Sequence, residues 1–230
     1  MTFRSALIVG AGHGRSAALA RAFAKEGMQV ALAARAPDKL AKLAQDTGAR
    51  TFACDATQRA DVEAVFAALD AAKAAPDVVV YNASYRTRGP LIDLDPAEVE
   101  KAIAVTAFGA FLVAQAAVRR MLPHRHGAVF LTGASAGVKG YAQSAPFAMG
   151  KFALRGLAQS MARELSPQGI HVAHVVVDGG IRSARRIEPP DQPDSLLDPD
   201  AIAASYVHLL HQPRNAWSWE IEVRPWVEKF

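Results

Sequence analysis

Short apolar runs alternate along the chain with longer stretches in which apolar and polar residues mix at helical spacing. The runs have the length of buried strands, and the stretches have the length of amphipathic helices. The predicted strands cover residues 5–12, 29–35, 50–56, 77–84, 127–135, 170–180 and 217–225. The predicted helices cover residues 16–27, 37–48, 59–73, 96–122, 146–166 and 198–212.

The early strands are continuously apolar rather than alternating, as in "SALIVGAG" at 5–12 and "DVVVYNAS" at 77–84. Strands buried on both faces have this composition, which is typical of a parallel sheet covered by helices. The strict alternation of strand and helix predicts an α/β fold, a single Rossmann-type domain over residues 1–230. Its sheet is expected to be doubly wound and parallel, with about seven strands and helices on both faces. Ligands bind such folds at the carboxyl ends of the strands.

One segment, residues 184–200, interrupts the pattern because it is rich in proline and aspartate. We expect it to form a mobile loop over the substrate. A simple mobile connection between two elements is the alternative.

Composition narrows the range of partners. The chain of 230 residues is 51% hydrophobic, which suffices for one core, and its net charge of +4 is modest. The basic residues are densest at 119–126, after an apolar helical stretch, where cations complement the helix dipole. No RNA-binding motif accompanies them, so we expect no nucleic-acid partner. The histidine spacing predicts no metal site. His171 and His174 are three apart on a strand and so face opposite sides, and His208 and His211 can share a helix face but have no evident third ligand.

Membrane insertion and disulfide bonds are not expected. The longest uncharged run, residues 102–118, is shorter than the roughly 20 residues of a membrane span, and no signal peptide is predicted. Cys54 is the single cysteine of the chain. This composition fits a reducing cytoplasm, which is the expected location.

Three glycines, Gly10, Gly12 and Gly14, lie between the first predicted strand and the first predicted helix, with His13 among them. Glycines at such a junction allow a tight turn and let a pyrophosphate approach the backbone. The helix N-terminus adds free N–H groups and the positive end of the dipole. A plain tight turn is the alternative, but the position at the first strand–helix junction favours a dinucleotide site.

The second predicted strand ends in Ala34-Arg35. Enzymes that prefer NAD commonly have an acidic residue here, which holds the ribose 2′-hydroxyl. A guanidinium pairs instead with a 2′-phosphate. The sequence therefore favours NADP(H), with NAD(H) as the second choice, and a solvated arginine is the alternative interpretation.

Several segments match known motifs in part. Residues 9–16, "VGAGHGRS", keep two glycines of a Thr-Gly-x-x-x-Gly-x-Gly motif at Gly10 and Gly14, with Ser16 at the third. "CDAT" and "YNAS" follow the third and fourth strands, and "DGGIRS" follows the sixth, with Asp178 in place of a proline. In this order the segments resemble the short-chain dehydrogenase/reductase family over essentially the whole chain. The resemblance implies a nicotinamide nucleotide bound by Gly10, Gly12, His13, Gly14, Arg35, Asp55, Ala56, Asn82, Ala83, Lys151, Gly179, Ile181 and Ser183.

The same resemblance assigns four catalytic positions to Thr106, Ala134, Phe147 and Lys151, where the family has asparagine, serine, tyrosine and lysine. Only the lysine is retained. In the family the tyrosine exchanges the proton that accompanies hydride transfer, and the lysine lowers the pKa of the tyrosine and binds the nicotinamide ribose. Phe147 has no proton to exchange, so cofactor binding is expected and classical carbonyl reduction is not.

Two nearby groups are candidates to replace the missing ones. Ser135 is one residue from the serine position, and Tyr141 lies between the fifth strand and the following helix. Ordinary loop packing is the alternative for both.

The residues thus favour an NADP(H)-binding oxidoreductase of short-chain type with a non-classical proton donor and an unidentified small-molecule substrate. The alternative is a catalytically inactive NADP(H)-binding sensor or partner protein. A weaker alternative is that Ser16 crowds the packing and abolishes cofactor binding. The family associates through helices that correspond here to the apolar stretches 102–118 and 146–162, so we expect a homodimer or homotetramer.

Overall fold

Seven parallel strands form one sheet in residues 2–229, the part of the chain that this computed structural model describes. The strands are β1 (Ser5–Val9), β2 (Gln29–Ala34), β3 (Arg50–Ala53), β4 (Val78–Tyr81), β5 (Gly127–Thr132), β6 (Ile170–Val177) and β7 (Glu220–Val223). Their order across the sheet is β3-β2-β1-β4-β5-β6-β7. The direction of winding reverses between β1 and β4, which is where such sheets bind ligands.

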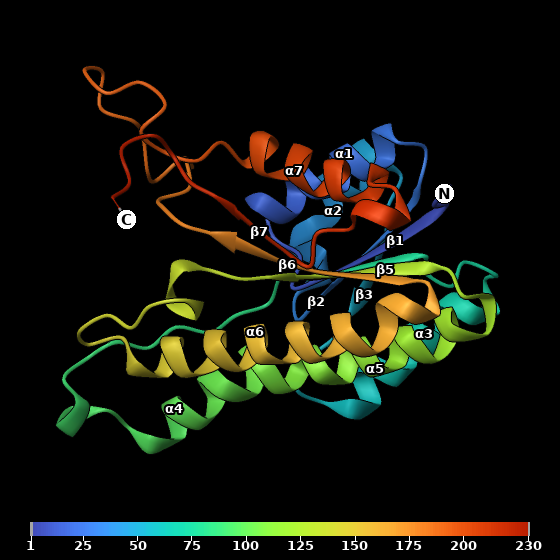
Figure 1. The fold of residues 1–230 in the computed structure, drawn as a ribbon, viewed down its shortest axis with the longest axis horizontal. Coiled ribbons are helices and arrows are strands. Elements are labelled where there is room, and N and C mark those ends of the chain that lie inside the picture. The colour runs from blue at the N-terminus through green and yellow to red at the C-terminus, as the bar shows by residue number, and fades with distance from the viewer. Residues whose placement is uncertain (1, 230) are drawn as a thin grey trace.

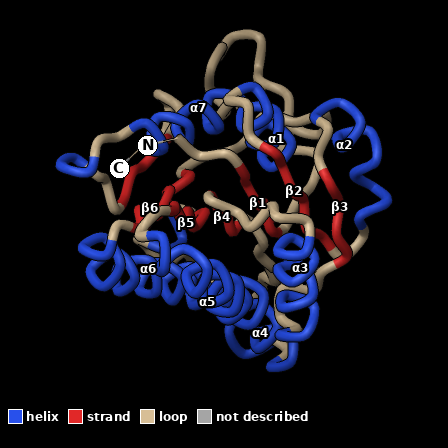
Figure 2. The backbone as a smooth tube through the Cα atoms, turned by 90° about the vertical axis from the view of Figure 1, so that its right-hand side faces the viewer, coloured by secondary structure: helices blue, strands red, loops and turns tan. Residues whose placement is uncertain are grey.

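Helices cover both faces of the sheet (Figure 1, Figure 2). One layer contains α1 (Arg15–Lys25), α2 (Ala41–Thr47) and α7 (Pro199–His211). The other contains α3 (Arg59–Ala71), α4 (Pro96–Ile103), α5 (Gly109–Met121) and α6 (Ala145–Leu165). The predicted Rossmann-type, doubly wound α/β fold is confirmed.

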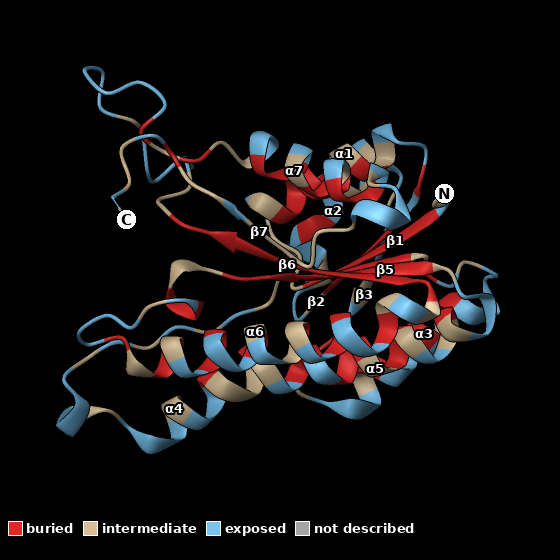
Figure 3. Cartoon of the chain, viewed as in Figure 1, coloured by how far each residue is buried: buried red, intermediate tan, exposed pale blue. Residues whose placement is uncertain are grey.

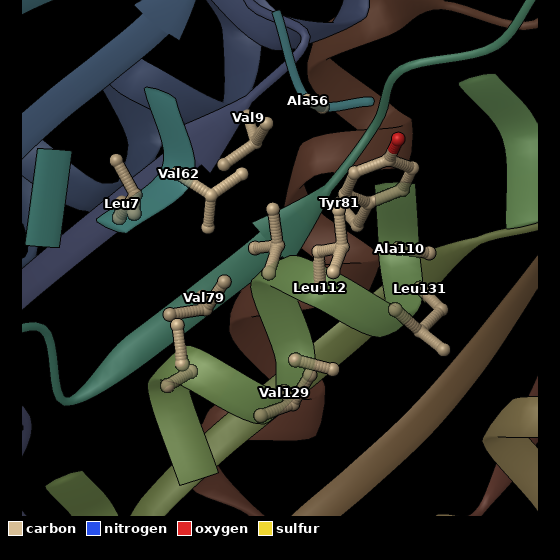
Figure 4. Close-up of a cluster of buried hydrophobic side chains, with 14 of the residues drawn as sticks. Leu7, Val9, Ala56, Val62, Val79, Tyr81, Ala110, Leu112, Val129 and Leu131 are labelled. Carbon is tan, nitrogen blue, oxygen red and sulfur yellow. The ribbon is translucent and has the colours of Figure 1, made fainter. Parts of the chain in front are cut away.

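Each face of the sheet has its own apolar core, and the central strands β1, β4, β5 and β6 are buried between the two cores (Figure 3). Leu7, Val79 and Val129 are paired across β1, β4 and β5 and lie side by side in the core under α3 and α5 (Figure 4). The next residues along two of these strands, Ile8 and Val80, belong to the core on the opposite face. Burial on both faces explains why these strands are apolar at every position.

Two predicted helices differ in detail from the structure. The stretch at 37–48 starts with a 3₁₀ turn, Pro37–Leu40, before α2. The stretch at 96–122 contains a π-helical turn, Ala104–Phe108, between α4 and α5. Several predicted strands are too long; for example, the strand predicted at 127–135 ends at Thr132. The residues beyond the strand ends form the loops that carry the candidate site.

Within the described residues, the helical stretch Pro96–His124 has the length and apolar composition of a membrane span. Half of its most apolar window is buried inside the fold, and core helices share these properties. It is therefore weak evidence for a membrane.

The segment between β6 and α7 extends beyond the sheet as a long loop, drawn in orange in Figure 1. The two ends of the loop are joined by a hydrogen bond, in which the backbone N–H of Leu197 donates to the carbonyl of Gly180 at 2.8 Å. The indole Nε1 of Trp226 donates to the carbonyl of Pro193 at 3.1 Å, which links the loop to the C-terminal segment. Mobility of this loop stays a prediction.

Candidate active site

A cavity of about 500 Å³ lies at the carboxyl ends of β1, β2, β3 and β4. We call it the first cavity. It brings together eight of the predicted nucleotide-binding residues: Gly10, Gly12, His13, Arg35, Asp55, Ala56, Asn82 and Ala83. These residues come from four separate strand ends. The cavity also contains Lys39, Arg15 and Ser84 in its wall.

The glycine loop brings β1 close to β4. Gly10 has a φ of +80°, and a Cβ at this position would lie 2.4 Å from the backbone nitrogen of Ala83. Only glycine allows this approach without strain. Gly12 and Gly14 differ, because a Cβ on either would meet nothing within 4 Å. Both glycines therefore face open space, and Gly12 lines the first cavity, whereas Gly14 does not.

The N-terminus of α1 is ready to bind an anion. Its N-cap residue is Gly14, and no side chain caps the helix. The backbone N–H groups of Ala17 and Ala18 donate to the carbonyl of Gly14. Those of Arg15 and Ser16 are left for another acceptor, and the helix dipole favours a negative one. The residues of the loop and the helix thus fit the pyrophosphate of a dinucleotide.

Ser16, at the position of the third family glycine, is accommodated without crowding. Its hydroxyl donates to the carbonyl of Gly10 at 3.1 Å and accepts from the side-chain amide of Asn82 at 2.6 Å. The amide oxygen of Asn82 accepts from Nε of Arg15 at 2.8 Å. This network joins the glycine loop to the end of β4 and fixes the side chain of Arg15 between them.

The far end of the first cavity is positively charged. Arg35 and Lys39 both line it, beside Asp55. The pKa of Asp55 is lowered, chiefly by a hydrogen bond from the backbone N–H of Thr57 and also by the charge of Arg35. Neither Arg35 nor Lys39 forms an ion pair within residues 2–229. Both cations are thus available to a phosphate ligand.

A smaller cavity of about 220 Å³, which we call the second cavity, adjoins the carboxyl ends of β5 and β6. Its wall consists of Arg15, Ser84, Arg86, Gly133, Ala134, Phe147, Lys151, Val177, Gly179 and Ile181. It therefore unites three of the four predicted catalytic positions with two predicted nucleotide-binding residues. Arg15 and Ser84 line both cavities, so the two cavities are neighbours along the same edge of the sheet.

Lys151 is the buried cation of the second cavity, with a side chain on α6 and 2% exposure. Its Nζ donates to the backbone carbonyl of Thr132 at 2.6 Å. Burial lowers the pKa of Lys151 from 10.5 to about 7, and the charges of Arg15 and Arg86 contribute in the same direction. A lysine with this pKa can exchange a proton near neutral pH.

Phe147 lies one turn before Lys151 on α6 and is also buried. The guanidinium carbon of Arg86 lies 4.1 Å from the centroid of its ring, and Nζ of Lys151 lies 5.8 Å from it. Two cations therefore contact the ring at the position where the sequence resemblance predicts a tyrosine. Phe147 offers these cations an aromatic face and no proton.

The structure does not bring the remaining predicted residues into the second cavity. Thr106 is fully buried in the π-helical turn, where it packs against Gly150 of α6. Ser135 begins a 3₁₀ turn, and Tyr141 is exposed, with Nζ of Lys139 5.8 Å from its ring centroid. None of these residues lines either cavity, and Ser183 does not either. The placement of Ser135 and Tyr141 as substitutes for the catalytic groups is not supported by this geometry.

Sequence reasoning missed three basic residues, Arg15, Lys39 and Arg86. A signal was present for Arg86, because "SYRTRG" places arginines directly after β4, at the ligand-binding edge of the sheet. For Arg15 the signal was its position in the first turn of α1, next to the glycine loop. No group of three or more potential metal ligands is found within residues 2–229.

Together the sheet order, the glycine loop and the first cavity define a dinucleotide-binding protein of the Rossmann class. The chain belongs to the short-chain dehydrogenase family, whose model matches residues 4–190. An uncharacterized oxidoreductase from Staphylococcus aureus (strain N315) is 29% identical over 232 aligned residues, which cover 98% of each chain.

Solved structures of this family have the same fold. A short-chain dehydrogenase from Rhodopseudomonas palustris is 34% identical, with a TM-score of 0.84 over 97% of this chain and 99% of that one. A metagenomic short-chain oxidoreductase solved in complex with NADP is 30% identical, with a TM-score of 0.83 over 96% of this chain and 97% of that one. The likeness is to oxidoreductases over the whole chain.

Proposed function

We propose that this protein is an NADP(H)-dependent oxidoreductase that interconverts a small carbonyl compound and its alcohol without a tyrosine acid. The observation that carries the proposal is that the two cavities adjoin and share Arg15 and Ser84 in their walls. Arg35 lies at one end and Lys151 at the other. This arrangement suits a long nucleotide whose reactive end reaches Lys151.

The preference for NADP(H) over NAD(H) rests on the unpaired cations Arg35 and Lys39 in the wall of the first cavity. A guanidinium and an ammonium there would stabilise a 2′-phosphate through charge-assisted hydrogen bonds. The relative that was solved with NADP agrees with this choice. Gly10, Gly12, Gly14 and the N-terminus of α1 would hold the pyrophosphate.

The proposed chemistry assigns the proton to Lys151. The hydride for the carbonyl carbon of the substrate would come from the reduced nicotinamide, once bound. The ammonium of Lys151 donates its proton to the carbonyl oxygen, so the product is an alcohol and the lysine becomes a neutral amine. Solvent then restores the proton. Thr132 positions Nζ by accepting one of its hydrogen bonds, and the ring of Phe147 keeps water from that side of the amine.

A panel of aldehydes, ketones, imines and activated alkenes with NADPH tests this function by the loss of reduced-nicotinamide absorbance. We expect turnover of at least one class, and Lys151→Met should lower kcat about 10²–10⁴-fold. The rate of reduction should fall as the pH rises above about 7, because the proton-donating form of Lys151 is lost. A matched variant, Ala134→Ser with Phe147→Tyr, restores two residue types of the family site.

If NADPH binds but no compound of the panel is turned over, the proposal of an oxidoreductase is contradicted. That result would favour a nucleotide-binding sensor or partner protein. Turnover by the double variant, together with none by the wild type, would likewise favour a catalytically inactive wild-type protein. If the wild type already matches the double variant, the tyrosine is dispensable here.

We further expect a homodimer or homotetramer in a reducing cytoplasm. Phe108 and Phe111 are exposed where the π-helical turn meets α5, and Met149 and Phe152 are exposed on α6 in the same helical layer. An association through these helices would cover the four side chains. Cys54 is buried and is the single cysteine of the chain, so no disulfide bond within the chain would require an oxidising compartment.

A further inference from the structure

The second cavity has an excess of positive charge that no acidic side chain balances. Its wall contains Arg15, Arg86 and Lys151, and none of its lining residues is acidic. Some arginines elsewhere in the chain are compensated; for example, Arg120 pairs with Asp70 on the helical surface. Like charges collected without a partner destabilise one another, so a bound anion would stabilise this arrangement.

Arg86 is held over the part of the cavity where the reaction would take place. Its guanidinium stacks on the buried ring of Phe147 at 4.1 Å, which is a favourable cation–π distance. Within residues 2–229 Arg86 forms no ion pair, and its donors remain free for a ligand. Because residue 147 is the position of the family's proton donor, a substrate beside Phe147 also lies beside Arg86.

Further guanidinium groups extend this positive field. Burial lowers the pKa of Arg86, and the nearby charges of Arg88 and Arg186 lower it further. Nη1 of Arg186 lies 2.8 Å from the point that a Cβ on Gly180 would occupy. Gly180 is flanked by Gly179 and Ile181, which both line the second cavity. Arg186 therefore reaches the rim of the same cavity from the loop between β6 and α7.

We infer that the substrate carries an anionic group, a carboxylate or a phosphate, which Arg86 and Arg186 bind beside Phe147. The inference rests on the proposed function, in which this cavity takes the substrate. The planar guanidinium matches the oxygens of both groups with paired hydrogen bonds. Arg15, which lines both cavities and is tied to the glycine loop, is the cation nearest to the nucleotide. Arg86 and Arg186 thus remain for the substrate.

Calorimetry on the NADPH-saturated full chain tests the binding step without turnover. Malonate and inorganic phosphate serve as probes, and malonamide is the uncharged control. We expect at least one anion to bind and Arg86→Gln to weaken it about 10–100-fold, the effect of losing a charged hydrogen bond. Arg86→Lys keeps the positive charge but loses the paired N–H donors of the guanidinium, so its affinity for the anion should lie between those of the wild type and Arg86→Gln. Arg4→Gln makes the same charge change before the amino end of β1 and should leave binding unaltered.

Paired substrates test the same inference by kinetics. The pairs are 4-oxobutanoate with butanal, and glyceraldehyde 3-phosphate with glyceraldehyde. We expect kcat/KM to be at least about tenfold higher for the charged member of one pair, and Arg186→Gln and Arg86→Gln to reduce that ratio. The pair with the larger ratio identifies carboxylate or phosphate as the preferred group.

The outcomes separate the two proposals. If NADPH binds but neither anion binds more tightly than malonamide, the inference is overturned and the proposed function stands. Equal kcat/KM within both pairs also overturns it. If NADPH does not bind at all, the proposed function fails and the inference falls with it. If no aldehyde is turned over, the calorimetric binding of malonate and phosphate alone tests whether the second cavity binds an anionic group.

Discussion

Lys151 shows most clearly how one residue determines what this site can do. Its position one turn after Phe147 follows from the sequence, but its burial does not. The ammonium group is enclosed by β5, α6 and two arginines, and its pKa is lowered to about 7. The same burial that prepares it to exchange a proton also makes it a source of instability in the cofactor-free protein.

Lys151→Met should stabilise the cofactor-free protein at neutral pH. The lysine has a pKa of about 7 in the folded state and 10.5 when unperturbed, so the unfolded chain binds more protons between these values. The stability of the wild type should therefore rise with pH in this window, by up to about 1.4 kcal/mol per pH unit from this group. Below pH 7 the lysine is charged in both the folded and the unfolded chain, so the wild type carries the full destabilisation of burying that charge.

Urea unfolding of both proteins at several pH values between 6 and 10 measures this difference. The advantage of Lys151→Met should shrink as the pH rises toward 10.5. Lys25→Met, on the exposed end of α1, provides the control. A variant advantage that does not vary with pH would show that the lysine is not charged and buried as described.

At the residue scale the sequence predicted many of the residues that line the first cavity and few of the basic residues around Lys151. Gly10, Arg35 and Asp55 directly follow strands or open helices, so the topology alone brings them together. Ser135 and Tyr141 lie farther along a loop, where the chain position does not determine which way a side chain points. The importance of Arg86 depends on its contact with Phe147, which no local pattern contains.

The junction of β1 and α1 is the element on which the first cavity depends. Gly10 lets the end of β1 approach the end of β4, while Gly12 leaves room for a ligand. The two glycines thus have different roles, although the sequence pattern treats them alike.

Gly10→Ala should lower the free energy of unfolding by about 2–4 kcal/mol, because its φ is +80° and the new Cβ would meet backbone atoms of Ala83. Gly12→Ala should change it by less than about 1 kcal/mol, since its Cβ would point into open space. Thermal or urea unfolding without cofactor measures both. Equal losses in the two variants would refute this division of roles.

The π-helical turn, Ala104–Phe108, is the feature at element scale that the sequence did not reveal. One extra residue per turn leaves the apolar pattern of a long helix almost unchanged, so the pattern predicts one continuous helix. The turn has a packing role, since the hydroxyl of Tyr81 donates to the carbonyl of Val105 at 2.5 Å. Val105 also lines the first cavity, so the turn contributes to the site.

The architecture of the whole molecule was predictable because it depends on alternation rather than on detail. Apolar runs buried on both faces and separated by helices leave few arrangements other than a parallel, doubly wound sheet. The long loop between β6 and α7 lacks such a pattern, so the sequence could not predict which of its residues, such as Arg186, approach the second cavity.

At this scale we predict that Phe152→Glu weakens the association of chains. Phe152 is exposed on α6 near Met149, and a carboxylate buried in an interface would be unpaired. Sedimentation of the wild type should give a dimer or tetramer, and the variant should shift toward the 24.5 kDa monomer. Ile187→Glu, an equal change at an exposed residue of the long loop, should leave the assembly intact. A monomeric wild type would contradict the expected association.

The central claim is that the first cavity binds NADP(H), and calorimetric titration of the cofactor-free protein with NADPH and with NADH tests it most directly. We predict one NADPH per chain, bound at least about tenfold more tightly than NADH. Arg35→Ser should remove most of this preference by weakening NADPH while leaving NADH nearly unchanged. Tighter binding of NADH, or binding of neither nucleotide, would contradict the account.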